Sequence, residues 1–415
     1  MGGITRSNHC RASKAEHIAG PLPHFLAKIA SECTQSGREL NHMKYEVISA
    51  DSHINEPPGT WIERVPARFK DAAPRIVPTP DGGEGWRFPD QPQVHSFGLV
   101  SATLQKGEAR GPERYIPSGL KFDEIARGSW DPRQHIEDMR ADGCDASIVY
   151  FGVAARMYNI KDRDLRLACF RAFNDWLGEF CSYDPLRLVG PPLLPVEEES
   201  IQDAIDELQR NLKCWHVRSA QIPIFPWKRY YDKFYEPLWA LTQELELPLA
   251  FHRGLNRPFA FGAPSQGGPW MANQVMRDFS YSMPLADLVF GGVFDHFPNL
   301  KIVSAEGRTG WLIHFVQRAD ESLRRHGPWL KVNLNRLPSD CVKYNVYSTF
   351  IDDRAGIVMR ELIGVDTQMW SSDYPHSDST WPSSMKIIQD QFKGVPAGDK
   401  YKMIAGNAVR LYKLG

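Results

Sequence analysis

The chain has 415 residues and a formal net charge of −1 at pH 7, with 49 basic and 50 acidic side chains. This length can bury a large core, and the balanced charge gives no electrostatic reason to expect nucleic acid or an anionic membrane as a partner. The longest apolar runs fall well short of the roughly 20 residues that a bilayer requires, so we expect no membrane span.

Residues 1–42 carry several charges and no sustained apolar stretch of the signal-peptide type. We interpret them as an N-terminal extension before a folded region over residues 43–415, and we expect a cytoplasmic protein. The seven cysteines form no CxxC pair and no metal-ribbon spacing, which predicts reduced thiols.

Apolar runs typical of strands recur eight times along the chain. They lie at 45–50, 147–151, 188–190, 219–222, 249–252, 301–304, 346–349 and 367–371. Between several of them, apolar residues keep helical spacing, over 165–180, 201–212 and 234–245. Strand–helix alternation predicts an α/β fold with a parallel sheet, and eight strands predict closure into a distorted (β/α)8 TIM-type barrel.

One long segment, 59–130, interrupts this alternation after the first strand. It is rich in proline, glycine and charge, and shows neither strand nor helix periodicity. Such a stretch is usually a functional loop or a mobile segment. We interpret it as an insertion that forms a lid over the active site or a surface for a partner.

Polar side chains follow the apolar runs in a way that indicates a metal site. Asp51 and His53 end the first run, two residues apart and therefore on one face of a strand. His252, Glu306 and Asp373 each follow a later run. Because barrel enzymes place their chemistry at the carboxyl ends of the strands, these carboxylates and imidazoles are expected to share a divalent cation, Zn, Mn or Fe.

Two more side chains extend this set. Glu56 completes the pattern Asp-x-His-x-x-Glu-Pro, and His376 lies three residues after Asp373. Some of these residues also have a purely structural explanation. Asp51 could cap a turn, and His376 could simply be a turn residue. His296 precedes a strand, so we expect it near the opposite end of the barrel and do not count it as a ligand.

Four motifs together resemble the amidohydrolase-2 branch of the amidohydrolase superfamily, which contains aminocarboxymuconate-semialdehyde decarboxylase and the resorcylate-type decarboxylases. The resemblance spans Tyr45 to Tyr412 and rests on Asp51-Ser52-His53, Phe251-His252-Arg253-Gly254, Phe294–Trp311 and Ser372–His376. It implies a distorted (β/α)8 barrel with a catalytic divalent metal. Matched by motif, the ligands would be Asp51, His53, His252 and Asp373.

The chain departs from the family pattern after the sixth strand. The family decarboxylases carry a water-activating histidine there, whereas this chain has Glu306. We therefore favour hydrolysis slightly over decarboxylation, with Asp373 as general base and His252 and Glu306 also catalytic. Because Glu56, Glu306 and His376 exceed the needs of one ion, a dinuclear Fe or Mn/Fe oxygenase on the same scaffold is a close alternative.

A small carboxylate- or amide-bearing molecule is the expected substrate. Its expected contacts are Arg253, Arg308, Trp311 and Trp381. A third alternative is a scaffold subunit of a hetero-oligomer, suggested by the aromatic and basic run 227–231. We therefore expect a homo- or hetero-oligomer.

Overall fold

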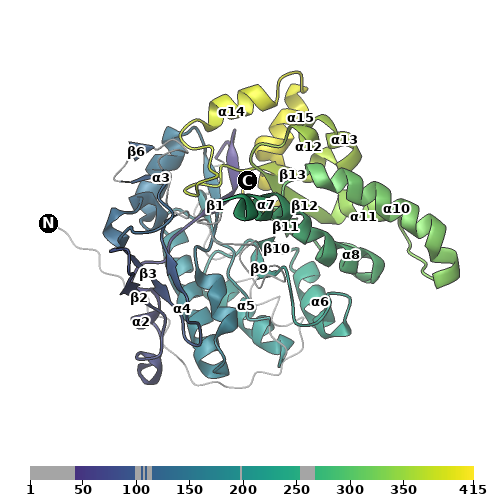
Figure 1. Ribbon diagram of the computed structural model, residues 1–415. Coiled ribbons are helices and arrows are strands. Elements are labelled where there is room, and N and C mark those ends of the chain that lie inside the picture. Colours follow the sequence, from purple (N-terminus) through teal and green to yellow (C-terminus); the bar gives the residue numbers. More distant parts are fainter. Residues whose placement is uncertain (1–42, 99–103, 106–107, 110–114, 197–198, 253–266) are drawn as a thin grey trace.

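We describe the protein from a computed structural model, which places residues 43–98, 104–105, 108–109, 115–196, 199–252 and 267–415. The expected N-terminal extension and Arg253 lie outside these described residues. Strands occupy the centre of the molecule and helices surround them (Figure 1).

Eight parallel strands form this centre, in two sheets. The first sheet has the order β1-β7-β8, and the second has the order β13-β12-β11-β10-β9. The strands are β1 (Ile48–His53), β7 (Ala146–Tyr150), β8 (Leu188–Val189), β9 (Ala220–Pro223), β10 (Leu249–His252), β11 (Ile302–Ser304), β12 (Val346–Phe350) and β13 (Gln368–Trp370). Each overlaps one of the eight predicted runs.

Irregular hydrogen bonds join the two sheets at both pairs of edges. Beyond β8, Leu194 N donates to the Gln221 carbonyl of β9 over 3.0 Å. Beyond β13, Asp373 N donates to the Asp51 carbonyl of β1, also over 3.0 Å. The α/β barrel fold that the sequence predicted is confirmed.

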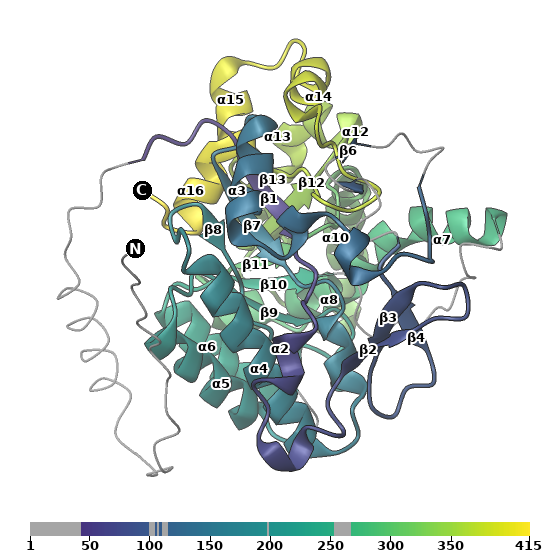
Figure 2. The same cartoon turned by 90° about the vertical axis from the view of Figure 1, so that its left-hand side faces the viewer.

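Helices pack around the outside of the strands (Figures 1 and 2). The three predicted helices are present as α4 (Arg163–Cys181), α5 (Ile201–Cys214) and α6 (Glu236–Glu244). None of the helices in the described residues is both long and apolar enough to cross a bilayer. Side chains cap the N-termini of α4 and α5: the Asp162 carboxylate accepts a hydrogen bond from Leu165 N, and the Ser200 hydroxyl accepts one from Gln202 N. The helices of the barrel are α3 (Pro132–Ala141), α4 (Arg163–Cys181), α5 (Ile201–Cys214), α6 (Glu236–Glu244), α7 (Gly268–Arg277), α8 (Ser282–Phe290), α9 (Val293–His296), α10 (Gly310–Leu330), α11 (Pro338–Asn345), α12 (Arg354–Val358), α13 (Arg360–Ile363), α14 (Ser384–Gln391), α15 (Ala397–Tyr401) and α16 (Asn407–Leu411).

The segment between β1 and α3 holds more regular structure than its composition suggested. It contains α2 (Gly59–Ile62), an antiparallel sheet of β2 (Arg75–Pro78), β3 (Glu84–Arg87) and β4 (Val94–Ser96), and a hairpin of β5 (Leu104–Gln105) and β6 (Glu108–Ala109). These strands of two to four residues are too short for a clear sequence period.

Aromatic packing anchors this insertion to the barrel. Trp86 of β3 meets Trp61 of α2 edge to face, with ring centroids 4.6 Å apart. Trp61 in turn donates its indole N–H to the Cys169 carbonyl of α4 over 3.2 Å. The insertion therefore shares its core with α4, while its role as a lid or partner surface stays a prediction.

Candidate metal centre

Side chains from three strand ends converge at the mouth of the barrel. Asp51 Oδ1 lies 3.5 Å from His53 Nε2 and 3.4 Å from His252 Nε2. Asp373 Oδ1 approaches His53 Nε2 to 3.2 Å. These four side chains are at most 2% exposed. Residues from β1, β10 and the turn after β13 thus meet in one buried cluster.

Two further predicted residues border this cluster. His376 Nδ1 lies 3.1 Å from Asp373 Oδ1, and the His376 ring stacks on the His53 ring with centroids 3.7 Å apart. Glu306 Oε2 lies 3.8 Å from His252 Nε2. The turns after β11 and β13 therefore deliver Glu306 and His376 to the same place.

The buried polar atoms of this cluster fit a divalent cation. Among the described residues, Asp51 Oδ1, His53 Nε2 and both Asp373 carboxylate oxygens have no partner with hydrogen-bond geometry. Leaving such atoms buried and unsatisfied is costly. Ligand atoms of Asp51, His53 and His252 lie within 4.8 Å of one another, as do those of His53, Asp373 and His376. Carboxylate oxygens and imidazole nitrogens are the donors that Zn, Mn and Fe accept.

A hydrogen bond prepares His53 as a ligand. Its Nδ1–H donates to the Phe151 carbonyl over 2.9 Å, which leaves the lone pair on Nε2, the nitrogen that faces the carboxylates. Burial lowers the pKa of His53, and the neighbouring His376 lowers it further. The imidazole is therefore neutral, as metal binding requires.

The pKa values of Asp373 and His376 move apart. Burial would raise the pKa of Asp373, but the adjacent His376 and His53 outweigh it and hold that pKa far below its usual range. Burial lowers the pKa of His376, but the carboxylates of Asp373, Glu306 and Asp51 together outweigh burial and raise that pKa. Asp373 is thus ionised and His376 readily holds a proton.

Two strained turns present the acidic residues. Glu306 and Asp373 have φ angles of 59° and 56°, in the left-handed region that non-glycine residues seldom adopt. Arg308 shares this conformation, with a φ of 58°. Such strain collects at functional sites, where the surrounding structure maintains it.

Thr349 of β12 is a site residue that the sequence analysis missed. Its hydroxyl donates to Asp51 Oδ2 over 3.2 Å and accepts from Glu306 N over 2.7 Å. It therefore orients one ligand and fixes the strained turn beside another. A threonine inside a strand is common, so the sequence carried no signal for this role.

Arg277, at the end of α7, was also missed. Its Nη2 lies 3.4 Å from Glu306 Oε1, and its side chain is 22% exposed. In the sequence it is one basic residue beside an acidic one, Asp278, a pair that gives no sign of a role in the site.

Glu56 lies apart from the two ligand groups. Its carboxylate accepts hydrogen bonds from the backbone N–H groups of Gly152, Val153 and Ala154, directly after β7. Amide donors thus occupy the oxygens that the sequence analysis assigned to a metal.

The expected substrate contacts are engaged with the protein itself. Arg308 donates to the Asp352 carbonyl and pairs with Asp278 and Asp378. The indole N–H groups of Trp311 and Trp381 donate to the carbonyls of Gly307 and Asp138. His296 ends α9 before β11 and belongs to neither ligand group.

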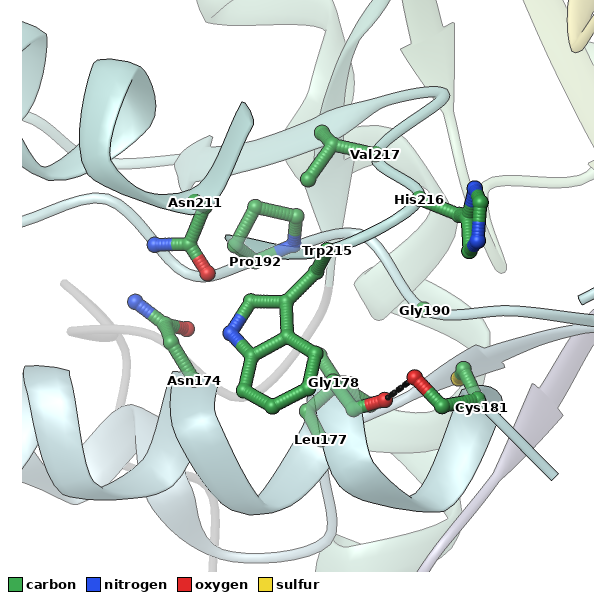
Figure 3. A pocket seen from close by; sticks show the side chains of 11 residues that line it. Asn174, Leu177, Gly178, Cys181, Gly190, Pro192, Asn211, Trp215, His216 and Val217 are labelled. Atoms are coloured by element: carbon green, nitrogen blue, oxygen red, sulfur yellow. Dashed lines mark hydrogen bonds between the residues drawn. The ribbon is translucent and has the colours of Figure 1, made fainter. Parts of the chain in front are cut away.

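A cavity elsewhere in the molecule is too small for a substrate. It lies between α4, α5 and the segment after α5 (Figure 3), and its volume of about 10 Å³ holds one water molecule. The Trp215 indole covers Gly178 so closely that a Cβ there would come within 2.3 Å of it. This cavity is a packing feature and is unrelated to the cluster of carboxylates and imidazoles.

The fold and the ligand cluster define a metal-dependent barrel enzyme. A family model described as amidohydrolase matches residues 51–414, and the chain belongs to this family. It is similar to the 2-amino-3-carboxymuconate-6-semialdehyde decarboxylase of Dictyostelium discoideum, with 24% identity over 304 residues, 71% of this chain and 80% of the relative. The resemblance inferred from the motifs is confirmed.

Solved structures share the fold. An amidohydrolase from Mycobacterium avium subsp. paratuberculosis K-10 has a TM-score of 0.71 at 19% identity, over 90% of this chain and 100% of its own. The 2,6-dihydroxybenzoate decarboxylase from Rhizobium has a TM-score of 0.58 at 18% identity, over 89% of this chain and 99% of its own. A 5-carboxyvanillate decarboxylase from Novosphingobium aromaticivorans DSM 12444, solved with manganese, has a TM-score of 0.61 at 18% identity. The match covers 89% of this chain and 97% of that structure's chain.

Proposed function

We propose that the protein is a divalent-metal-dependent decarboxylase of a small carboxylic acid. This proposal reverses the slight preference for hydrolysis that Glu306 suggested. It is supported by the relatives, several of which are named decarboxylases. The observation that carries it in this chain is the pairing of the buried Asp373 with the partly exposed His376, because decarboxylation needs a proton donor at that place.

The ligand arrangement supports one ion in preference to two. The two possible ligand groups share His53, and its Nδ1–H is already used by the Phe151 carbonyl. A single Nε2 lone pair can bind only one cation, so the groups are alternatives or parts of one site. A bound divalent ion would supply Lewis acidity toward the substrate's oxygen atoms. A single ion disfavours the alternative of a dinuclear oxygenase.

The Asp373–His376 pair is suited to move a proton. When the bond to the carboxyl group breaks, CO2 leaves and the remaining carbon keeps the electron pair, so that carbon must accept a proton. The Asp373 side chain is 1% exposed, whereas that of His376, 3.1 Å away, is 17% exposed. His376 can therefore take a proton from solvent and hold it against the ionised Asp373 carboxylate, ready to be given to the substrate carbon.

Arg277 makes the site accept an anion. Asp51, Asp373 and Glu306 bring three negative charges, of which a divalent ion would balance two. A proton on His376 would balance the third. The Arg277 guanidinium beside Glu306 adds a further positive charge, which lowers the electrostatic cost of bringing a carboxylate substrate into this buried site. We assign Arg277 the role of binding the anionic substrate.

A substrate screen tests the proposed function. Enzyme loaded with Mn²⁺ or Zn²⁺ is incubated with a panel of aromatic and unsaturated carboxylic acids, amides and esters, and CO2 release, amide or ester cleavage and dioxygen uptake are measured. We expect CO2 release that stops when the metal is removed. Metal-dependent cleavage without CO2 would instead support hydrolysis, and dioxygen uptake would support oxygenation. A panel without turnover would favour the scaffold.

A further inference from the structure

We propose that Glu56 is a positioning residue, which holds the backbone after β7 so that the Phe151 carbonyl keeps His53 in the tautomer that binds the metal. This inference rests on the metal site of the proposed function, and is independent of which reaction the ion supports. Glu56 acts through two other groups and touches neither the ion nor the substrate.

The contacts of Glu56 define a tight backbone cradle. Oε1 accepts from Gly152 N over 3.1 Å and from Ala154 N over 3.0 Å, and Oε2 accepts from Val153 N over 3.0 Å. The residue is 1% exposed. Hydrogen bonds from N–H donors to a buried carboxylate are among the stronger ones in proteins, so the carboxylate fixes the conformation of three consecutive residues.

This cradle begins at the residue next to the one that orients His53. The Phe151 carbonyl, in the peptide bond to Gly152, accepts from His53 Nδ1 over 2.9 Å. Because the carbonyl and the Gly152 N–H belong to one planar peptide, fixing the N–H also fixes the direction of the carbonyl. Glu56, only three residues after His53, thus sets the acceptor for the His53 ring.

Gly152 shows how closely the two segments approach. A Cβ at this position would lie 2.6 Å from the Ile54 carbonyl oxygen and 2.9 Å from Glu56 Oε2. Any side chain would push the carboxylate off its donors. A substitution at Gly152 should therefore disrupt the same hydrogen bonds to Glu56.

The surroundings of Glu56 argue against direct metal binding. The amide N–H groups direct the positive ends of their dipoles at both carboxylate oxygens. A cation at the same oxygens would face these dipoles at close range. A side chain whose oxygens are satisfied by amides supports a ligand and is unsuited to be one.

Metal affinity of Glu56→Gln tests the inference. In this variant an NH2 group replaces one acceptor oxygen and meets the backbone donors. We expect the affinity for Mn²⁺, measured by the electron paramagnetic resonance signal of the free ion, to fall about 10-fold or more, in the range typical of groups that orient metal ligands. Gly152→Ala should produce the same loss and serves as a second test if Glu56→Gln folds poorly.

Glu207→Gln is the matched control. Glu207 is also a buried glutamate, 4% exposed, but its partners are Asn174, Arg210 and Asn211, on α4 and α5. This variant should lose stability while its Mn²⁺ affinity stays at the wild-type value. If it weakens Mn²⁺ binding as much as Glu56→Gln, the effect is a general loss of stability and the inference is wrong.

The His53 tautomer gives a readout that a merely structural role would not change. In metal-free protein, ¹⁵N NMR should find the proton on Nδ1 of His53 in the wild type and in Glu207→Gln. The Nδ1–H population should fall in Glu56→Gln and in Gly152→Ala. Wild-type Mn²⁺ affinity and tautomer in both of these variants would overturn the inference. A substrate screen without turnover would leave both measurements unaffected, so the proposed function and this inference fail separately.

Discussion

His53 at the barrel mouth and His135 on α3 begin from nearly the same environment. Each is 1% exposed, and each places Nδ1 2.9 Å from a backbone carbonyl, that of Phe151 for His53 and that of Gly128 for His135. They differ at the other ring nitrogen. His135 Nε2 lies 3.4 Å from the Ser147 hydroxyl, whereas His53 Nε2 faces the carboxylates of Asp51 and Asp373.

This difference separates a packed histidine from a ligand. A hydroxyl can donate to a neutral imidazole and complete its hydrogen bonds. Two ionised carboxylates cannot donate, and they leave the lone pair directed at a region of negative charge. Burial and an oriented tautomer are therefore shared by both histidines, and the acceptors around Nε2 identify the metal site.

The largest expected effect is on catalysis at the mouth. Replacing Asp373 with Asn removes a ligand charge and the acceptor of the His376 proton, so we expect kcat/KM to fall about 1,000-fold, within the range for lost acid–base groups. The assay is CO2 release at saturating metal. Full activity in Asp373→Asn would remove Asp373 from the mechanism, while His135→Gln should retain near-wild-type turnover.

The pH dependence of stability should report on the packed histidine. Burial lowers the pKa of His135 to about 4, from 6.5. Between these values the unfolded chain binds a proton that the folded chain does not, so stability is full above pH 6.5 and falls as the pH drops toward 4, by up to about 3 kcal/mol. Urea midpoints of metal-free protein across this range test it. The urea midpoint should depend less steeply on pH in His135→Gln. An unchanged pH dependence would show that His135 is not its source.

Metal addition should separate the two histidines. An ion that binds only the folded state, at about 100 times its dissociation constant, adds about 2.7 kcal/mol to the free energy of unfolding. We expect this gain for wild type and for His135→Gln, and no gain for His53→Ala. Thermal unfolding with and without Mn²⁺ measures it. Equal stabilisation of His53→Ala would place the ion elsewhere.

The smallest effect is expected at Arg277. Arg277→Gln should raise KM about 10-fold, the loss of about 1.4 kcal/mol of substrate binding, with little change in kcat. Arg277→Lys keeps the charge and should recover part of the affinity. A fall in kcat at unchanged KM would instead assign Arg277 to the orientation of Glu306.

Sequence patterns predicted the fold and the main cluster for the same reason. Apolar runs mark strands, and a polar residue that ends such a run must lie at the strand's carboxyl end, where parallel strands converge. This logic located Asp51, His53, His252 and Asp373. It also located Glu306 and His376, which the structure brings within 4 Å of ligand atoms.

The remaining features depend on packing that no local pattern encodes. Whether Glu56 binds an ion or backbone amides depends on residues almost 100 positions later. Thr349 and Arg277 reach the site only through the mutual placement of β12 and α7. Arg308, Trp311 and Trp381 were expected to bind substrate. In the structure each donates a hydrogen bond to a backbone carbonyl, that of Asp352, Gly307 or Asp138, and the sequence alone did not predict these bonds.

The barrel closes where the chain after β13 meets β1, through contacts such as that between Ser49 and Ser372, which are 323 positions apart. A growing polypeptide therefore holds Asp51 and His53 long before it holds Asp373. Full coordination must await the segment after β13, and a product clipped before that segment would keep most of the ring yet load metal poorly. Ion uptake can thus serve as an experimental test of whether the segment after β13 has joined the first strand.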